Sequence, residues 1–168
     1  MALLAFDEFI FGNDRVSFMT FTRNTYVKFS SVEKKKNTEN LRNQIACLKK
    51  ECLNPNFFKK MHTISKAIRE SLSMFSLNYN ANWILIFTCG CAEGESAKSI
   101  EYLRNTNVNI IMVDMKGSGD DSQLCKIAGC TREGMYMEVP TIEQFKLAMH
   151  SICSIAIPLQ PVIIQLFT

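Results

Sequence analysis

The first part of the chain shows two different spacings of hydrophobic side chains. Residues 1–12 place apolar side chains at helical spacing and end at Gly12, which predicts a short helix. Residues 15–21 alternate apolar and polar positions, and residues 26–29 form a second short strand-like run. Only a few residues separate the two runs, so a β-hairpin is expected there.

Two amphipathic helices are expected after this hairpin. Residues 38–53 place Leu41 and Ile45 on one face, and Thr38 is the predicted N-cap. Residues 57–77 carry a longer apolar stripe at helical spacing, which is typical of a helix packed on a core. The first half is therefore expected to fold as helix, hairpin, helix and helix.

From residue 83 onward, strands and helices alternate. The run WILIFT at residues 83–88 is continuously apolar, as in a strand covered on both faces. The expected order is strand 83–88, helix 95–105, strand 108–114, helix 122–129, strand 135–139 and helix 141–153. Such alternation predicts parallel strands joined by right-handed crossovers. The predicted fold class is α/β, a Rossmann-like, doubly wound, mostly parallel sheet with an antiparallel edge hairpin.

Composition narrows the class of protein. The chain has 168 residues, 47% of them apolar, which suits one globular domain with a core. Its seven cysteines are an odd number, which argues against a disulfide framework. The N-terminus lacks a basic region, and the apolar tail is short and interrupted by Pro158 and Pro161. We therefore expect a reduced, soluble, intracellular protein (cytoplasmic or nuclear) without a membrane span.

The charge is unevenly distributed, but it does not predict nucleic-acid binding. Residues 1–80 carry 13 Lys and Arg against 7 Asp and Glu, whereas residues 81–168 carry 6 against 9. The basic excess lies in short lysine runs, and no aromatic residues alternate with them as in a single-strand binder. We interpret these lysines as the solvated surface of helices, and no nucleic-acid partner is predicted.

Several segments resemble the von Willebrand factor A-type domain, in the order and spacing of that family. Residues 12–21, GNDRVSFMTF, are similar to its turn and second strand. Further similar segments are 66–68 (KAI), 84–90 (ILIFTCG), 108–113 (VNIIMV), 124–128 (LCKIA) and 134–136 (GMY). The resemblance covers residues 1–154 and leaves 155–168 as a C-terminal tail. The ending at residues 134–140 also resembles that of small subunits of transcription factor IIH, an intracellular branch of the family.

The resemblance implies a domain that binds protein partners at the carboxyl ends of its strands, often through a divalent ion. In the family, a DxSxS loop, a threonine and an aspartate hold this ion, and Mg²⁺ prefers such oxygen ligands. Here Cys89 stands at the aspartate position and His62 at the threonine position, with Thr63 next to it. The chain also begins at the helix that follows the DxSxS loop. Thiol and imidazole groups do not replace carboxylates for Mg²⁺, so no metal or other cofactor is expected.

The resemblance also implies that a strand is missing from the centre of the sheet, between the strands at 15–21 and 83–88. Three arrangements would repair the sheet. Residues 161–167, PVIIQLF, insert there; a partner chain donates a strand, giving a homodimer by strand exchange; or the coding sequence is incomplete. A tail lying on the surface is equally consistent with the sequence, so these interpretations stay open.

The expected function is a non-catalytic protein-interaction or scaffold module with a degenerate metal site and no catalytic residues. The resemblance maps its partner-binding edge to His62, Thr63, Cys89, Gly90, Cys91, Glu93, Met115 and Gly117. Two alternatives remain at this point. One is a Rossmann-like enzyme that binds a small molecule near Gly117, and the other is an assembly subunit completed by strand exchange.

Overall fold

The structure of the 168-residue chain is a computed structural model. The structure describes residues 2–10, 15–21, 25–51, 64–75, 82–88, 102–115, 122–155 and 162–167.

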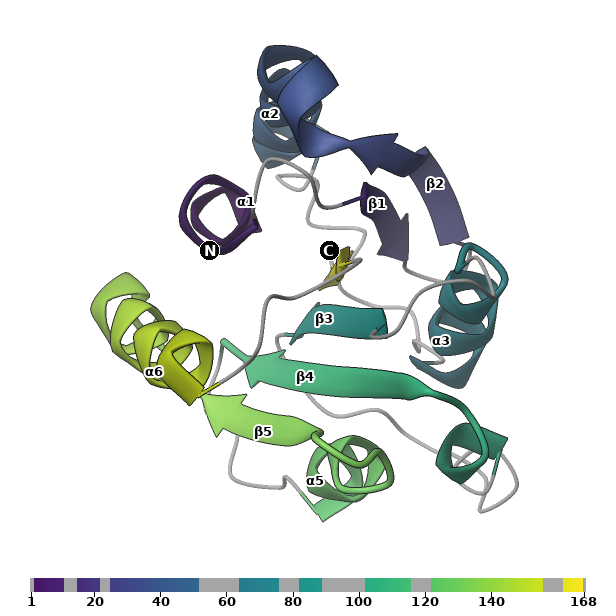
Figure 1. Ribbon diagram of the computed structural model, residues 1–168. Coiled ribbons are helices and arrows are strands. Elements are labelled where there is room, and N and C mark those ends of the chain that lie inside the picture. The colour runs from purple at the N-terminus through teal and green to yellow at the C-terminus, as the bar shows by residue number, and fades with distance from the viewer. Residues whose placement is uncertain are drawn as a thin grey trace.

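Helices and strands alternate along the described chain as expected for an α/β fold (Figure 1). The helices are α1 (Ala2–Phe9), α2 (Lys34–Glu51), α3 (Ile64–Leu72), α5 (Ser122–Ala128) and α6 (Ile142–Ile155). The strands are β1 (Arg15–Phe21), β2 (Thr25–Glu33), β3 (Asn82–Thr88), β4 (Val108–Asp114), β5 (Met135–Glu138) and β6 (Val162–Phe167). Within the described ranges, every helix is too short or too polar to cross a bilayer.

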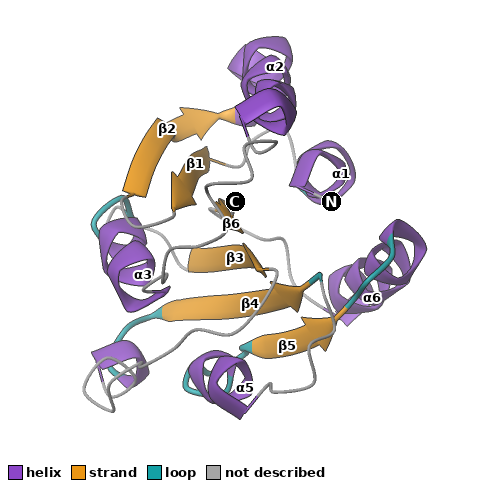
Figure 2. Ribbon diagram, turned by 180° about the vertical axis from the view of Figure 1, so that it is seen from behind, coloured by secondary structure: helices purple, strands orange, loops and turns teal. Residues whose placement is uncertain are grey.

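The strands form one six-stranded sheet in the order β2-β1-β6-β3-β4-β5. β1 and β2 are antiparallel, and every other neighbouring pair is parallel. β6 is the last strand in sequence, yet it lies between β1 and β3 (Figure 2). Among the arrangements left open by the sequence, the structure therefore shows insertion of the C-terminal segment into the centre of the sheet, rather than a tail on the surface. The predicted Rossmann-like fold with an antiparallel edge hairpin is confirmed.

Helices cover both faces of the sheet, which explains why β3 and β4 are buried along almost their whole length (Figure 1). On one face, Phe145 of α6 packs on Phe87 of β3 with ring centroids 5.5 Å apart. On the other face, Ile64 of α3 and Leu124 of α5 share a core with Ile86 of β3. Burial on both sides is the physical reason for the continuous apolar run predicted as a strand at residues 83–88.

The start of α2 differs from the sequence prediction. Thr38 was the predicted N-cap, but the helix begins at Lys34, directly after β2 ends at Glu33. A kink marks the helix at Asn37, whose φ is −137° and ψ is 19°. The Thr38 hydroxyl donates to the Lys34 carbonyl oxygen at 2.7 Å, so it bonds backwards into the preceding turn instead of capping the next one.

A bulge interrupts the pairing of β2 with β1 near Ser31, between the Phe18–Phe29 pair and the Val16–Val32 pair. Ser31 has a φ of 51°, in the left-handed region that a residue other than glycine rarely adopts. The Arg15 guanidinium holds this residue by donating to the Ser31 carbonyl and hydroxyl, and the Ser31 backbone N–H donates to the Ser17 hydroxyl at 2.8 Å. These bonds satisfy the backbone groups that the bulge removes from the ladder, and they direct the chain into α2.

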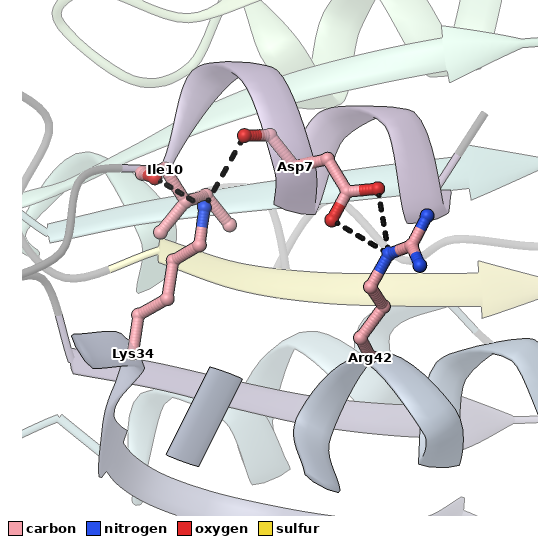
Figure 3. A network of polar contacts seen from close by, with 4 residues as sticks. All are labelled: Asp7, Ile10, Lys34 and Arg42. Atoms are coloured by element: carbon pink, nitrogen blue, oxygen red, sulfur yellow. Dashed lines mark hydrogen bonds and ion pairs between the residues drawn. The ribbon is translucent and has the colours of Figure 1, made fainter. Parts of the chain in front are cut away.

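Charged side chains of α2 bind α1 and the residue that follows it (Figure 3). Lys34 is 8% exposed. Its ammonium group donates to the Ile10 carbonyl at 2.6 Å and to the Asp7 carbonyl at 3.4 Å. The Arg42 Nε atom lies 3.0 and 3.1 Å from the two Asp7 carboxylate oxygens. A cation at the C-terminal end of a helix satisfies carbonyls that have no partner within the helix. Lys34 therefore caps α1 from the start of α2.

Replacing Lys34 with methionine is expected to destabilise the domain by about 1–3 kcal/mol, because it leaves the Ile10 carbonyl without this charged donor. The neighbouring exposed Lys35 provides the matched control, and Lys35→Met is expected to change stability by no more than about 0.5 kcal/mol. Urea unfolding followed by circular dichroism measures both. Equal effects of the two substitutions would contradict the assigned role of Lys34.

Candidate functional site

The carboxyl ends of three parallel strands meet at one edge of the sheet. Thr88 of β3 lies opposite Asp114 of β4, and Asp114 lies opposite Glu138 of β5. Two backbone bonds extend this alignment beyond the strands. The Met115 N–H donates to the Thr88 carbonyl and the Val139 N–H donates to the Asp114 carbonyl, both at 2.8 Å. We call these five residues the carboxyl edge, which is where open α/β sheets bind their ligands.

A buried carboxylate lies at the centre of the carboxyl edge. Asp114 is 0% exposed, and the Tyr136 hydroxyl donates to its Oδ2 atom at 3.4 Å. Tyr136 packs against the core on the α5 face, so the bond is made on that side of the sheet. Thr88, opposite Asp114, is 1% exposed. Because a buried carboxylate needs hydrogen-bond donors, this arrangement ties β4 to the edge strand β5.

The Asp114–Tyr136 contact can be tested by a double-mutant cycle. Tyr136→Phe removes only the hydroxyl, so we expect a loss of about 1 kcal/mol in the free energy of unfolding. When the same change is made in an Asp114→Ala background, its cost is expected to disappear, giving a coupling of roughly 0.5–1.5 kcal/mol. Urea titration of the four proteins measures it. Additive effects of the two substitutions would show that the hydroxyl does not hold the carboxylate.

Of the partner-binding residues predicted from sequence, Met115 lies in the described part of the chain. It is half-buried at the carboxyl edge and packs against the core on the α6 side. The other predicted residues lie outside the described residues, namely His62, Thr63, Cys89, Gly90, Cys91, Glu93 and Gly117. The small-molecule site considered near Gly117 lies outside them as well.

Sequence reasoning missed the buried pair of Asp114 and Tyr136. The available signal was a single acidic residue at the end of the otherwise apolar run VNIIMVD. A carboxylate at the end of a buried strand must find a hydrogen-bond donor, and a tyrosine in the neighbouring strand is a natural one. The register that brings Met112 opposite Tyr136, two residues before Asp114, could not be read from composition or spacing.

Comparison with known protein families gives a match over most of the chain. The model of the von Willebrand factor type A domain matches residues 6–151, most of the sheet and its helices but not β6. A search of curated proteins finds no match. Among solved structures, an uncharacterized membrane-spanning protein from Vibrio fischeri has a TM-score of 0.40 at 14% identity, covering 87% of this chain and 78% of that chain. This structural likeness is too distant to bear on function.

The family expected from the sequence is thus confirmed by a match over most of the chain, in a fold with the expected strand–helix alternation. Domains of this type are in general protein-interaction modules. This chain belongs to the von Willebrand factor type A domain family.

Proposed function

We propose that this domain is a non-catalytic protein-interaction module that binds its partner at the carboxyl edge without a metal ion. The observation that carries the proposal is the alignment of the ends of β3, β4 and β5, which brings Met115 and Glu138 to one edge. Glu138 is exposed and Met115 is half-buried. Glu138 pairs with Asp114 on the α5 side and Met115 packs on the α6 side, so the two residues flank the carboxyl edge. An exposed charge and a flexible apolar group at the ends of the strands suit contact with a protein partner.

The chemistry of the available donors supports binding without an ion. Mg²⁺ requires several oxygen ligands that are open to it. At the carboxyl edge, the oxygens of Thr88 and Asp114 belong to residues that are at most 1% exposed, and Asp114 accepts a bond from Tyr136. The sequence continues from Thr88 with Cys89, whose thiol is a soft ligand. Among the described residues of the carboxyl edge, Glu138 is the one exposed carboxylate, and a single such ligand falls short of the several that Mg²⁺ requires. We therefore derive no step that involves an ion.

The same burial supports a non-catalytic role. A general acid or base must come within hydrogen-bond reach of the substrate atom whose proton it transfers. Asp114 is enclosed between strands and helices, where it braces the sheet. The narrower likeness of residues 134–140 to small subunits of transcription factor IIH, with its scaffold role, stays a prediction.

Met115→Glu is the variant that tests this proposal. The domain is used to capture partners from cells of its source, and a captured protein is then purified for affinity measurement. A charge placed at the centre of a binding surface is expected to cost about 2 kcal/mol, roughly a 30-fold rise in Kd. Asn107→Glu is the matched control, because Asn107 is exposed at the amino end of β4, on the opposite edge of the sheet.

Two outcomes would contradict the proposal. One is equal binding by Met115→Glu and the native chain, with both variants shown by circular dichroism to be as folded as the native chain. The other is loss of binding when EDTA removes divalent ions, which would show that an ion mediates the contact. We expect EDTA to leave the Kd unchanged and Asn107→Glu to bind as the native chain does.

A further inference from the structure

Among the described strands, β6 joins two parts of the sheet that share no strand pairing with each other. β1 pairs with β2 and β6, whereas β3 pairs with β4 and β6. If β6 is removed, the strand order separates into the pair β2-β1 and the triplet β3-β4-β5. The facing sides of β1 and β3 then become two unpaired strand edges. We call the space between them the central slot.

The central slot accepts only a narrow class of occupant. Residues 16–20 of β1 and all of β3 are buried, so backbone groups along both edges cannot turn to water for hydrogen bonds. An occupant must therefore be a strand, and the register requires it to run parallel to both neighbours. It must also be uncharged, because a charge buried there would have no solvent. The β6 sequence, VIIQLF, meets these requirements.

The link between α6 and β6 sets how the slot is filled from within one chain. Six residues, 156–161, separate Ile155 from Val162, and they span at most about 24 Å. Phe145 packs on Phe87, which places α6 over β3, and packed layers lie roughly 10 Å apart. The link is thus long enough for β6 to enter the slot of its own chain.

The order of folding favours competition for the central slot between the chain's own β6 and the β6 of a second copy. β6 pairs with strands from the beginning and the middle of the chain, so its docking closes the longest loops in the fold. Contacts between distant segments form late, because their loop-closure entropy is not offset until the other strands are in place. Until then a folding chain has both an open slot and an unpaired β6. At high concentration, the β6 of a second copy reaches the slot as readily as the chain's own.

We propose that the central slot binds β6 of a second copy of this chain, producing a symmetric dimer by reciprocal strand exchange. In each slot, Ile164 of β6 keeps the same pairings with Phe18 of β1 and Leu85 of β3. Only the direction of the link between α6 and β6 changes. The ratio of dimer to monomer is then set by protein concentration relative to the effective concentration of the attached strand. This inference does not depend on partner binding at the carboxyl edge.

The test uses the full chain in two versions with different affinity tags, unfolded together and refolded. Refolding at about 1 mM, near the effective concentration given by a short link, should trap dimers that carry both tags, and refolding at about 10 µM should yield monomer. The dimers should survive dilution, because exchange back requires unfolding. Size-exclusion chromatography and sequential tag purification count both species. Monomer alone at both concentrations would overturn the proposal.

Changes in the link length separate strand exchange from ordinary association. Inserting six Gly and Ser residues after Leu159 should lower the dimer fraction, because a longer link favours closure within one chain. Deleting residues 157–160 leaves a reach of about 10 Å, no more than the layer separation itself, and should favour the dimer. Dimer fractions unaffected by both changes would overturn strand exchange. If the shortened chain fails to fold, the native and lengthened chains still decide the question. Strand exchange predicts a lower dimer fraction for the lengthened chain, whereas ordinary association predicts equal dimer fractions for both.

Discussion

Replacing Ile164 with proline is expected to abolish the cooperative unfolding transition of the domain. Ile164 lies in the middle of β6, opposite Phe18 of β1 and Leu85 of β3. Proline has no N–H to donate and does not fit a central strand. Both neighbouring residues are buried, so the freed backbone groups find no water. Because the two parts of the sheet are joined only through β6 among the described strands, the loss should exceed the roughly 5–15 kcal/mol that stabilises a domain.

Thermal and urea unfolding followed by circular dichroism measure this effect. Ile164→Val is the matched control, because valine keeps the backbone N–H and is a strong strand former. It should preserve a single sharp transition. A cooperative transition in Ile164→Pro close to that of the native chain would mean that the sheet does not require β6.

Gly134→Ala is expected to be the most damaging single-methyl change in the described chain. A Cβ atom at Gly134 would lie 1.9 Å from the Ala128 carbonyl oxygen and 2.2 Å from the Thr131 hydroxyl oxygen. Thr131 cannot move freely, because its hydroxyl donates to Ala128 and accepts from the Ile110 N–H. The added methyl therefore displaces the turn between α5 and β5 from β4. We expect a loss of about 3 kcal/mol and a fall in Tm of roughly 6–12 °C.

Gly129→Ala tests whether this cost comes from the close approach at Gly134 rather than from any glycine replacement. A Cβ at Gly129 would lie 3.1 Å from the Cys125 carbonyl oxygen, so that a shift of a few tenths of an ångström relieves it. Its effect should stay below about 1 kcal/mol. Differential scanning calorimetry of the two variants gives the comparison. Similar Tm values for both would contradict the assigned packing of the α5–β5 turn.

The buried strands β3 and β4 of the second half could be predicted because strands buried on both faces consist mostly of apolar residues. β3 and β4 are covered by helices on both faces, so their residues are apolar without alternation. The start of α6 was predictable for a local reason. Thr141 and Gln144 exchange hydrogen bonds between side chain and backbone, which is a capping box visible as a residue spacing.

The start of α2 was mispredicted because it depends on contacts between distant segments. Lys34 looks like one of three surface lysines in the sequence KKK, yet it is buried against the end of α1. Its partners, the Ile10 and Asp7 carbonyls, lie 24 and 27 residues earlier. Thr38 resembles an N-cap only when these tertiary bonds are ignored. A helical turn from Lys34 precedes the kink at Asn37, and the regular helix continues from Thr38, so the predicted start marks the kink and not the first residue of α2. The Thr38 hydroxyl bonds to the Lys34 carbonyl and therefore does not serve as the predicted N-cap.

For β6 and for the carboxyl edge, too, the sequence predicted some features, while others depend on how the strands pair. The sequence suggested that residues 161–167 form a strand, but an apolar run is equally consistent with a surface tail until the sheet order is known. Likewise, Met115 was placed at the candidate edge through the family resemblance, whereas Asp114 and Tyr136 meet only through the β4–β5 register. Pairing between strands is what composition and local spacing do not encode.

Backbone NOEs at Ile164 test the central claim, that β6 lies between β1 and β3, most directly. In uniformly labelled protein, we expect cross-peaks from Ile164 backbone protons both to residues around Phe18 and to residues around Leu85. The same two sets of contacts are expected in monomer and in exchanged dimer, since the pairing is identical in both. Contacts to only one of these strands, or direct contacts between Phe18 and Leu85 backbones, would contradict the six-stranded order on which the fold and the strand-exchange proposal depend.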